Sequence, residues 1–344
     1  MSATSSIIKV ENNTDSEILQ DISSSGRVRP WKEKKMQNEI LSRIYKLLFV
    51  KTSNNYFLRK AERLENCSKN VLYKVEENGK KRLANAFFCR VRLCSVCQWR
   101  RSLKVASQMF DILTEISNDY GFINMTLSLS NVGLDNLGDE IDHLMHTWTK
   151  FTQKKIYKNV VKGYYRALEV KLNDRQDEFH PHYHVILVVN KSYFNNKNFT
   201  SQAKWRQAWK EAARVAYDPY VWCRKLNEKK ILSAVPEFCK YTVKDGDYIF
   251  PNDLDLSEKL VEILDRDLSN RRFVAYGGII KETAKRLQME DVEAEDIDLV
   301  NVENEKKESP TVRVIAYTWM SGLSLESNYY RNKDLSNFYT NNRL

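Results

Sequence analysis

Two histidines separated by one residue are the first feature of this chain that could do chemistry. His182 and His184 flank Tyr183 at the start of the apolar run VILVV. In a β-strand, side chains at positions i and i+2 share a face, so both imidazoles would point the same way and Tyr183 would point into the opposite layer. Two convergent imidazoles suit a divalent metal ion. The alternative is two surface histidines on a strand, but three of the chain's five histidines fall within residues 180–184.

Glu169 is the candidate third ligand of this metal. It interrupts the otherwise apolar strand sequence ALEV. If residues 164–172 pair with 183–189 as a hairpin, Glu169 lies almost across from the histidines. A carboxylate and two imidazoles, with open positions for phosphate oxygens, fit Mg²⁺ or Mn²⁺ acting as a Lewis acid. The alternative role is a salt bridge to Lys171 or Arg166. His180, which precedes Pro181, is expected to stay outside the metal shell.

The segment PEFCKYTVK holds a candidate nucleophile. Glu237 and Tyr241 are four residues apart, which places them on the same side of a helix. A phenol can attack phosphorus when a metal polarises the phosphate, and a carboxylate one turn away can activate water for a second transfer. Lys244, on nearly the same face, could stabilise charge on the phosphate or the phenolate. The alternative for Glu237 is an acid near Pro236 that merely favours the helix dipole.

The cysteines suggest a second metal site. Cys89, Cys94 and Cys97 are closely spaced, and Cys67 supplies a fourth thiolate at a distance. Four thiolates form a closed, structural Zn²⁺ site, whereas the alternative is a set of buried cysteines. Four arginines surround the thiolates, where they could offset the charge of the site and contact DNA phosphates: Arg90, Arg92, Arg100 and Arg101.

Hydrophobic periodicity indicates the elements that position these groups. A strand with alternating apolar residues is expected at 123–129, in addition to the 164–172 and 183–189 hairpin. Residues 201–217 form a clear helical pattern, with Ser201 as N-cap. Further helices are expected at 40–48, 98–116 and 137–160, a short helix from Pro236 to Gly246, and a strand followed by a helix at 273–288. Trp205, Trp209 and Trp222 are expected in the core, although one could stack on an unpaired base.

Composition favours a nucleic-acid partner. The 344 residues carry a net charge of +10, although residues 290–308 hold nine acids and only two lysines. Outside that segment, 53 lysines and arginines face 36 acids, a surplus that attracts phosphate backbones. No apolar run approaches the roughly 18–20 residues that span a bilayer, and the N-terminus lacks a signal-peptide pattern, so we expect a cytoplasmic protein without a membrane partner.

Three segments, in this order, resemble the motifs of the HUH endonuclease superfamily: TLSLS at 126–130, HPHYHVILVV at 180–189 and EFCKYTVK at 237–244. The resemblance is greatest to the plasmid rolling-circle replication initiators that use one tyrosine and one glutamate. NAFFCRVRLCSVCQWRRSLK at 85–104 and RRFVAYGGIIKE at 271–282 also resemble flanking segments of that family, so the match covers roughly residues 30–288. Ser95 departs from the family in standing where proline is common, and the first motif is less rich in threonine.

This resemblance implies an α+β fold with an antiparallel central sheet and flanking helices, preceded by a zinc-stapled basic module. The expected divisions are a disordered tail at 1–30, a zinc-binding DNA-binding module at 31–115, the endonuclease domain at 116–288, an acidic linker at 289–310 and a C-terminal segment at 311–344.

The resemblance also implies a mechanism. Tyr241 would become joined to the 5′ phosphate of single-stranded or hairpin origin DNA, the free 3′-OH would prime synthesis with a host helicase and polymerase, and Glu237 would activate water at termination. The alternatives are a transposase or relaxase of the same chemistry, or a non-enzymatic zinc-dependent DNA-binding regulator.

Overall fold

The structure, a computed structural model, describes residues 17–23, 26–195, 199–226, 232, 235, 239, 243–302, 310–322 and 325–341. The chain divides into two compact units. The smaller unit comprises Met1–Glu33, Ser68–Phe87 and Lys307–Leu344, and the larger comprises Lys34–Cys67 and Phe88–Lys306.

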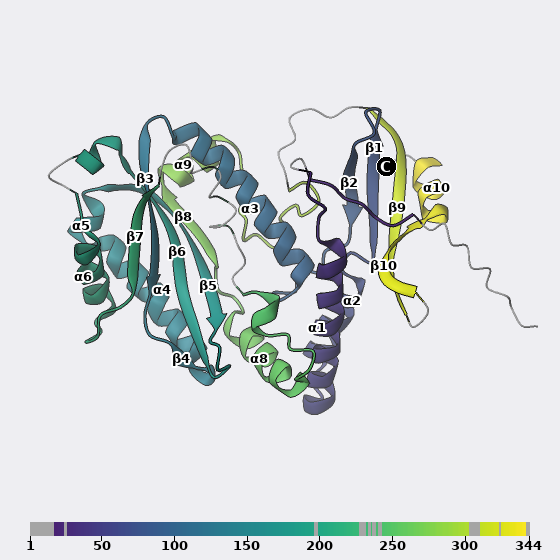
Figure 1. The fold of residues 1–344 in the computed structure, drawn as a ribbon, viewed down its shortest axis with the longest axis horizontal. Helices are drawn as coiled ribbons and strands as arrows, with labels where there is room; N and C mark the ends of the chain where they lie inside the picture. The colour runs from purple at the N-terminus through teal and green to yellow at the C-terminus, as the bar shows by residue number, and fades with distance from the viewer. Residues whose placement is uncertain are drawn as a thin grey trace, which may run out of the picture. The chain divides into compact units, whose positions relative to one another are not determined.

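The larger unit is built on an antiparallel sheet (Figure 1). In the described part of the chain, its strands follow the order β7 (Val221–Leu226), β3 (Tyr120–Ser128), β6 (Glu178–Asn190), β5 (Val161–Leu172) and β8 (Val274–Gly278), with β4 (Val132–Gly133) paired to β6. Every pairing is antiparallel. The expected antiparallel central sheet and its three expected strands are confirmed. In β6 the continuous apolar run Val185–Val189 is buried on both faces of the sheet.

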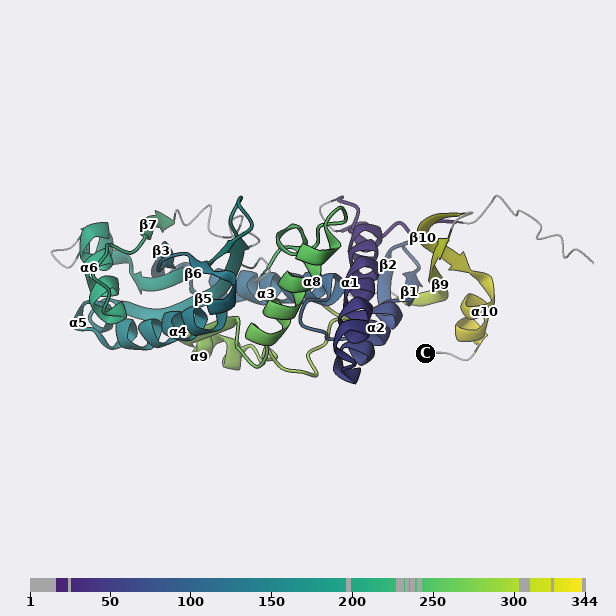
Figure 2. The ribbon, with the colours of Figure 1, turned by 90° about the horizontal axis from the view of Figure 1, so that it is seen from below.

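Helices cover the face of this sheet that lies opposite the histidines. They are α4 (Leu137–Gln153), α5 (Lys155–Lys158) and α6 (Gln202–Ala213), and Figure 2 shows α4 beneath the strands. Phe151 of α4 packs against Trp205 and Trp209 of α6. Ser201 caps α6 by accepting a hydrogen bond from the Lys204 amide, as the sequence predicted, but the helix ends at Ala213 because Arg214 adopts a left-handed conformation.

The other helices of the larger unit, as far as its residues are described, are α1 (Trp31–Thr52), α2 (Asn55–Asn66), α3 (Ser95–Ile116), α8 (Leu254–Asp267) and α9 (Ile279–Arg286). The first residues of α1 belong to the smaller unit. Short 3₁₀ turns occupy Leu134–Asn136, Lys191–Asn195 and Asp245–Asp247. A buried carboxylate holds three of the helices together. Asp265 on α8 accepts a hydrogen bond from the Tyr45 hydroxyl of α1 and pairs with Lys60 of α2. Since an unpaired buried carboxylate is costly, this pairing fixes how the helices meet.

The smaller unit contains a four-stranded sheet that the sequence did not reveal. Its order is β10 (Leu325–Asn332), β9 (Thr311–Gly322), β1 (Asn70–Glu76) and β2 (Lys81–Ala86), followed by α10 (Lys333–Asn341). Tyr73, Tyr317, Trp319 and Tyr329 are buried in it. The predicted division at 31–115 therefore differs from the structure, because residues 68–87 pair with the C-terminal strands while their flanking helices belong to the larger unit.

The predicted disordered tail also needs correction. Within the predicted 1–30 segment, residues 17–23 and 26–30 are ordered against the smaller sheet, where Leu19 donates its amide to the Tyr329 carbonyl. Asp21 is buried and accepts hydrogen bonds from the Trp31 indole at 2.7 Å and the Tyr73 hydroxyl at 2.9 Å. The polar composition of the segment suggested disorder, but the buried carboxylate of Asp21 anchors it because hydrogen bonds compensate for the burial of this carboxylate. Among the helices described, none is long and apolar enough to cross a bilayer.

Candidate active site

The register of β5 and β6 brings together the three predicted metal ligands. Glu169 on β5 lies directly opposite His182 on β6, and the register is regular from Gly163 to Leu172. Because side chains alternate, His184 shares this face with His182 and Glu169. The predicted hairpin and the cross-strand position of Glu169 are confirmed.

The three side chains converge closely enough to share one ion. The Glu169 Oε2 atom lies 2.7 Å from His184 Nε2 and 3.4 Å from His182 Nε2. One ligand atom from each of the three residues lies within 4.8 Å of the others. The expected alternative, in which Glu169 pairs with Lys171 or Arg166, is not what the structure shows. The three donors cover one side of an ion and leave positions for substrate oxygens.

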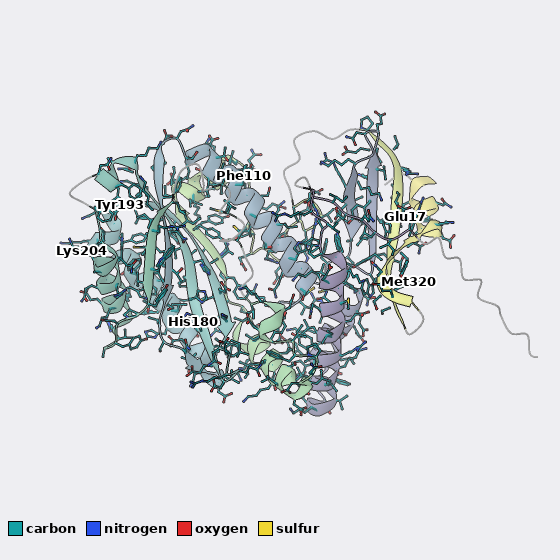
Figure 3. All side chains as sticks on the ribbon, in the orientation of Figure 1. Glu17, Phe110, His180, Tyr193, Lys204 and Met320 are labelled. Atoms are coloured by element: carbon teal, nitrogen blue, oxygen red, sulfur yellow. The ribbon has the colours of Figure 1, made fainter. Side chains whose placement is uncertain are left out.

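A main-chain hydrogen bond prepares His182 for a metal. His182 Nδ1 lies 3.0 Å from the His180 carbonyl oxygen, which can only accept, so Nδ1 carries the proton. In a neutral imidazole the Nε2 atom then has a free lone pair, and it is Nε2 that faces Glu169. The residues present therefore fit a divalent ion. His180 itself is not one of the converging three. Its Nδ1 contacts Asn131, and it is labelled in Figure 3 towards one end of the hairpin.

Charges around Glu169 keep it ionised. Burial acts to raise the pKa of the Glu169 carboxyl, but hydrogen bonds with His182 and His184 outweigh burial and hold this pKa well below its usual value. Lys244 extends to the same carboxylate, with Nζ 3.2 Å from Oε1, while 54% of its side chain stays exposed. Sequence reasoning missed Asp247, a half-buried neighbour whose pKa is raised by burial although Lys244 opposes the shift.

The opposite side of β6 fixes the strand to the core. Tyr183 is fully buried, as predicted, and its ring lies 6.0 Å from that of Trp148 on α4. The Arg166 guanidinium stacks 4.5 Å from the Tyr183 ring centre. This packing sets the orientation of β6 and therefore of the two histidines beside Tyr183.

Tyr241 and Glu237 lie outside the described residues, so their expected helix and roles stay predictions. Two described neighbours in the sequence do contact the sheet. Cys239, buried, hydrogen-bonds with Tyr165, whose ring lies on the histidine face of β5. Burial raises the pKa of Cys239 to about 12, which suits a packing residue. Lys244, the second neighbour, reaches Glu169.

The tryptophans separate into two kinds. Trp205 and Trp209 are fully buried, as expected of core residues. Trp222 on β7 is only half-buried. In the sheet it lies directly opposite Thr126 of β3, and Thr126 lies directly opposite His184 of β6. Directly paired residues share a face, so Trp222 lies on the histidine side of the sheet two strands from the metal ligands. The sequence offered no signal that separated it from the other two.

The four predicted zinc ligands converge in the larger unit. The sulfur of Cys67 lies 3.6 Å from those of both Cys94 and Cys97, and Cys89 lies 3.8 Å from Cys97. Four sulfurs at about 2.3 Å from a tetrahedral zinc ion are separated by about 3.8 Å. All four thiols are buried, and burial raises the pKa of the Cys97 thiol. Four buried thiols at this spacing fit Zn²⁺ by donor type and by geometry.

A buried lysine lies beneath this cluster, where sequence reasoning had expected arginines to offset its charge. Lys35 on α1 is 1% exposed, and its Nζ donates hydrogen bonds at 2.7 Å to the carbonyls of Glu65 and Cys67. The Asn38 side chain and the Arg90 amide donate to the sulfurs of Cys94 and Cys97. These cationic and N–H donors would stabilise thiolates over thiols.

The four predicted DNA-binding arginines bind the chain's own backbone. Arg100 is buried and donates to the carbonyls of Leu299 and Val300, so its assignment as a phosphate ligand is wrong. The other three arginines are less buried, but they also donate hydrogen bonds to main-chain carbonyls. Arg90 donates to Ile297, Arg92 to Leu268 and Arg271, and Arg101 to Val292.

The segment that supplies most of these carbonyls is the predicted acidic linker. In its described residues, up to 302, the side chains of Val292, Ile297, Leu299 and Val302 are buried. The linker prediction needs correction there, because apolar residues between the acids anchor the segment to the larger unit.

Comparisons with known proteins cover most of the chain. A family model described as "Replication protein" matches residues 80–330. A "Protein rep" from Bacillus amyloliquefaciens is 36% identical over 91% of this chain and 97% of its own length. A "Protein rep" from a Bacillus species is 37% identical over 83% of this chain and 98% of its own length, and one from Lentilactobacillus hilgardii is 32% identical over 88% and 96%. No solved structure matches.

Proposed function

This chain belongs to the replication protein family, and we propose that it initiates rolling-circle replication of a plasmid by nicking one strand of origin DNA. The observation that carries the proposal is the convergence of Glu169, His182 and His184 on one face of the sheet, with Lys244 against the same carboxylate. Two imidazoles and one carboxylate can hold a divalent ion that polarises a phosphate, and a neighbouring cation can stabilise the charge that develops during phosphodiester cleavage.

The proposed first step is attack by the Tyr241 oxygen on one phosphodiester. A bond forms between that oxygen and phosphorus, the bond from phosphorus to the 3′ oxygen breaks, and the released 3′ end takes up a proton as a hydroxyl. The phenol loses its proton to solvent or to a nearby base. A Mg²⁺ or Mn²⁺ ion held by Glu169, His182 and His184 would supply Lewis-acid polarisation of the phosphate.

The chain's own residues would prepare that step. The hydrogen bond from His182 Nδ1 to the His180 carbonyl orients the imidazole. Lys244, with more than half of its side chain exposed, can place a positive charge beside a phosphate oxygen. In the sequence, Tyr241 stands between the two residues that contact the histidine face, two positions after Cys239 and three before Lys244.

The proposed last step uses water. Once a round of synthesis has regenerated the nick site, Glu237 would take a proton from a water molecule that attacks phosphorus, and the bond from phosphorus to the 3′ oxygen would break, leaving a 3′-OH and a 5′ phosphate. That 3′-OH would attack the phosphotyrosine, which closes the strand and releases the Tyr241 phenol, so that a second tyrosine is unnecessary. The 3′-OH made in the first step would prime a host polymerase, and a host helicase would separate the strands. A Zn²⁺ ion at the four cysteines would have a structural role, because all four positions would be filled by protein ligands.

The decisive experiment uses single-stranded oligonucleotides tiled across the origin of the chain's own plasmid, incubated with protein and Mn²⁺. We expect a covalent protein–DNA adduct on one oligonucleotide, and we expect Tyr241→Phe to abolish both the adduct and nicking while DNA binding persists. Tyr220→Phe, at an exposed tyrosine, is the matched control and should behave as wild type. An adduct mapped to another tyrosine, or no adduct on any oligonucleotide, would refute the proposal.

A further inference from the structure

A basic cleft in the larger unit is lined by none of the three residues Glu169, His182 and His184, and it has no role in the reaction described above. Its volume is ≈ 510 Å³, and seven of its lining side chains are lysine or arginine, against two glutamates. Among the described residues that line the cleft, Val91 has the only apolar side chain. A cleft so rich in cations and so poor in apolar surface selects for a polyanion.

Four of the seven cations are neutralised by carboxylates of the larger unit. Lys60 pairs with Asp265, and Arg92 with Glu293. Arg271 pairs with Asp142, and Arg272 with Asp291. These ion pairs shape the wall of the cleft, but their charge is already compensated.

The remaining three cations are Arg63, Arg90 and Arg101. Among the described residues they form no ion pair, and each guanidinium donates a hydrogen bond to a main-chain carbonyl. Arg63 donates to the carbonyl of Cys89, Arg90 to that of Ile297 and Arg101 to that of Val292. A guanidinium has five N–H donors, so one such bond leaves donors for another anion. It also holds the side chain in place, which reduces the entropy lost on binding. The three arginines therefore form a prearranged set of cations, and among the described lining residues only the carboxylate of Glu295 remains outside the ion pairs to oppose them.

The chemistry of the lining indicates which polyanion fits. Guanidinium groups bind phosphate oxygens in a bidentate manner. Unpaired bases bind to proteins largely by stacking on aromatic rings, and the lining residues that the structure describes include no aromatic side chain. Duplex DNA instead presents phosphates outward at a high charge density, about one charge per 1.7 Å of helix axis.

We propose that this cleft binds the sugar–phosphate backbone of double-stranded DNA through Arg63, Arg90 and Arg101, independently of base sequence. The proposal deepens the proposed function, on which it rests for the identity of the ligand as DNA. It adds a duplex-binding site whose residues differ from those of the nicking reaction. Contacts of this kind position a protein on the duplex without reading bases.

The test measures the salt dependence of binding by the full-length protein to a short duplex of mixed sequence. Each phosphate contact contributes about 0.9 to the slope of log K against log salt concentration. The triple variant Arg63→Gln, Arg90→Gln, Arg101→Gln should lower that slope by about 2 to 3 and weaken binding equally to origin and unrelated duplexes. If the triple variant shows the same slope of log K against log salt concentration as the wild-type protein, the proposal is overturned.

The matched control removes the same charge elsewhere on the larger unit. Arg43→Gln, Arg59→Gln and Lys204→Gln change exposed side chains outside the cleft and should leave the slope near the wild-type value; Lys204 is labelled on α6 in Figure 3. An equal drop in the control would show that only net charge matters, which would also overturn the proposal.

A second variant covers the case in which the triple variant does not fold. Glu295→Lys, at the exposed rim of the cleft, should tighten duplex binding and steepen the slope, whereas Glu77→Lys in the smaller unit should not. No difference between these two variants would count against the cleft.

Nicking of a short single-stranded oligonucleotide separates this proposal from the proposed function. Cleft variants should nick it at the wild-type rate, because the oligonucleotide presents no duplex. If the wild-type protein does not nick the oligonucleotide but the cleft variants change the salt dependence of duplex binding as expected, the nicking chemistry is refuted and the proposed duplex-binding site is supported.

Discussion

Replacing Lys244 by glutamine should tighten metal binding while it slows nicking. In the structure the Lys244 ammonium competes for the carboxylate that a metal would use, since Nζ lies 3.2 Å from Glu169 Oε1. Because 54% of the lysine side chain is exposed, the interaction is screened as in water, and Coulomb's law then gives about 1.3 kcal/mol. That energy corresponds to roughly a ninefold change in an equilibrium constant.

The expected result is therefore Mn²⁺ affinity up to about ninefold higher in Lys244→Gln, since the ammonium no longer holds Glu169 or repels a divalent cation. Isothermal titration with Mn²⁺ in a Tyr241→Phe background measures this without cleavage. Nicking by Lys244→Gln on the Tyr241 chain should fall, because a cation that stabilises the phosphate is lost.

The control for this experiment is Lys162→Gln, an exposed lysine on the same strand as Glu169 but near its other end. Its Mn²⁺ affinity should match wild type. A lower Mn²⁺ affinity in Lys244→Gln would refute the reasoning, because it would mean that the lysine supports the site and does not compete for it. Equal gains in both variants would attribute the effect to net charge.

Three further predictions concern the metals and the termination step. EDTA should abolish nicking, and addition of Mn²⁺ or Mg²⁺ should restore it; full activity in EDTA would contradict this. His182→Ala should reduce nicking severely because one of the three metal ligands is lost. Elemental analysis should find about one zinc per chain, and zinc-free native protein would exclude the site. The Cys97→Ser variant should lose that zinc and melt at a lower temperature. The Cys223→Ser variant, which changes a cysteine outside the cluster, should keep the zinc. Glu237→Gln should leave the first nick intact but cause products longer than one plasmid length to accumulate, and normal termination in that variant would assign Glu237 a merely structural role.

The sequence alone determined the parts of this protein that follow from local rules. Strand alternation placed His182 and His184 on one face and Tyr183 on the other, and a short hairpin connection limited the registers that could bring Glu169 opposite them. The spacing of Cys89, Cys94 and Cys97 identified a thiolate cluster in the same way. Such predictions succeed because the period of a strand and the ligand preferences of a metal hold whatever surrounds them.

Only the tertiary structure decided what depends on partners distant in the chain. A buried carbonyl must be hydrogen-bonded, and the carbonyls of Leu299 and Val300 are satisfied by Arg100, which sequence reasoning had assigned to DNA. Lys35, unremarkable in the sequence, became the buried cation beneath the thiolates. Strand β1 pairs with β9 across more than 230 residues, a pairing that no local pattern encodes. In each case the deciding quantity is the cost of leaving a buried polar group unpaired, and that cost depends on which distant segment comes to lie beside it.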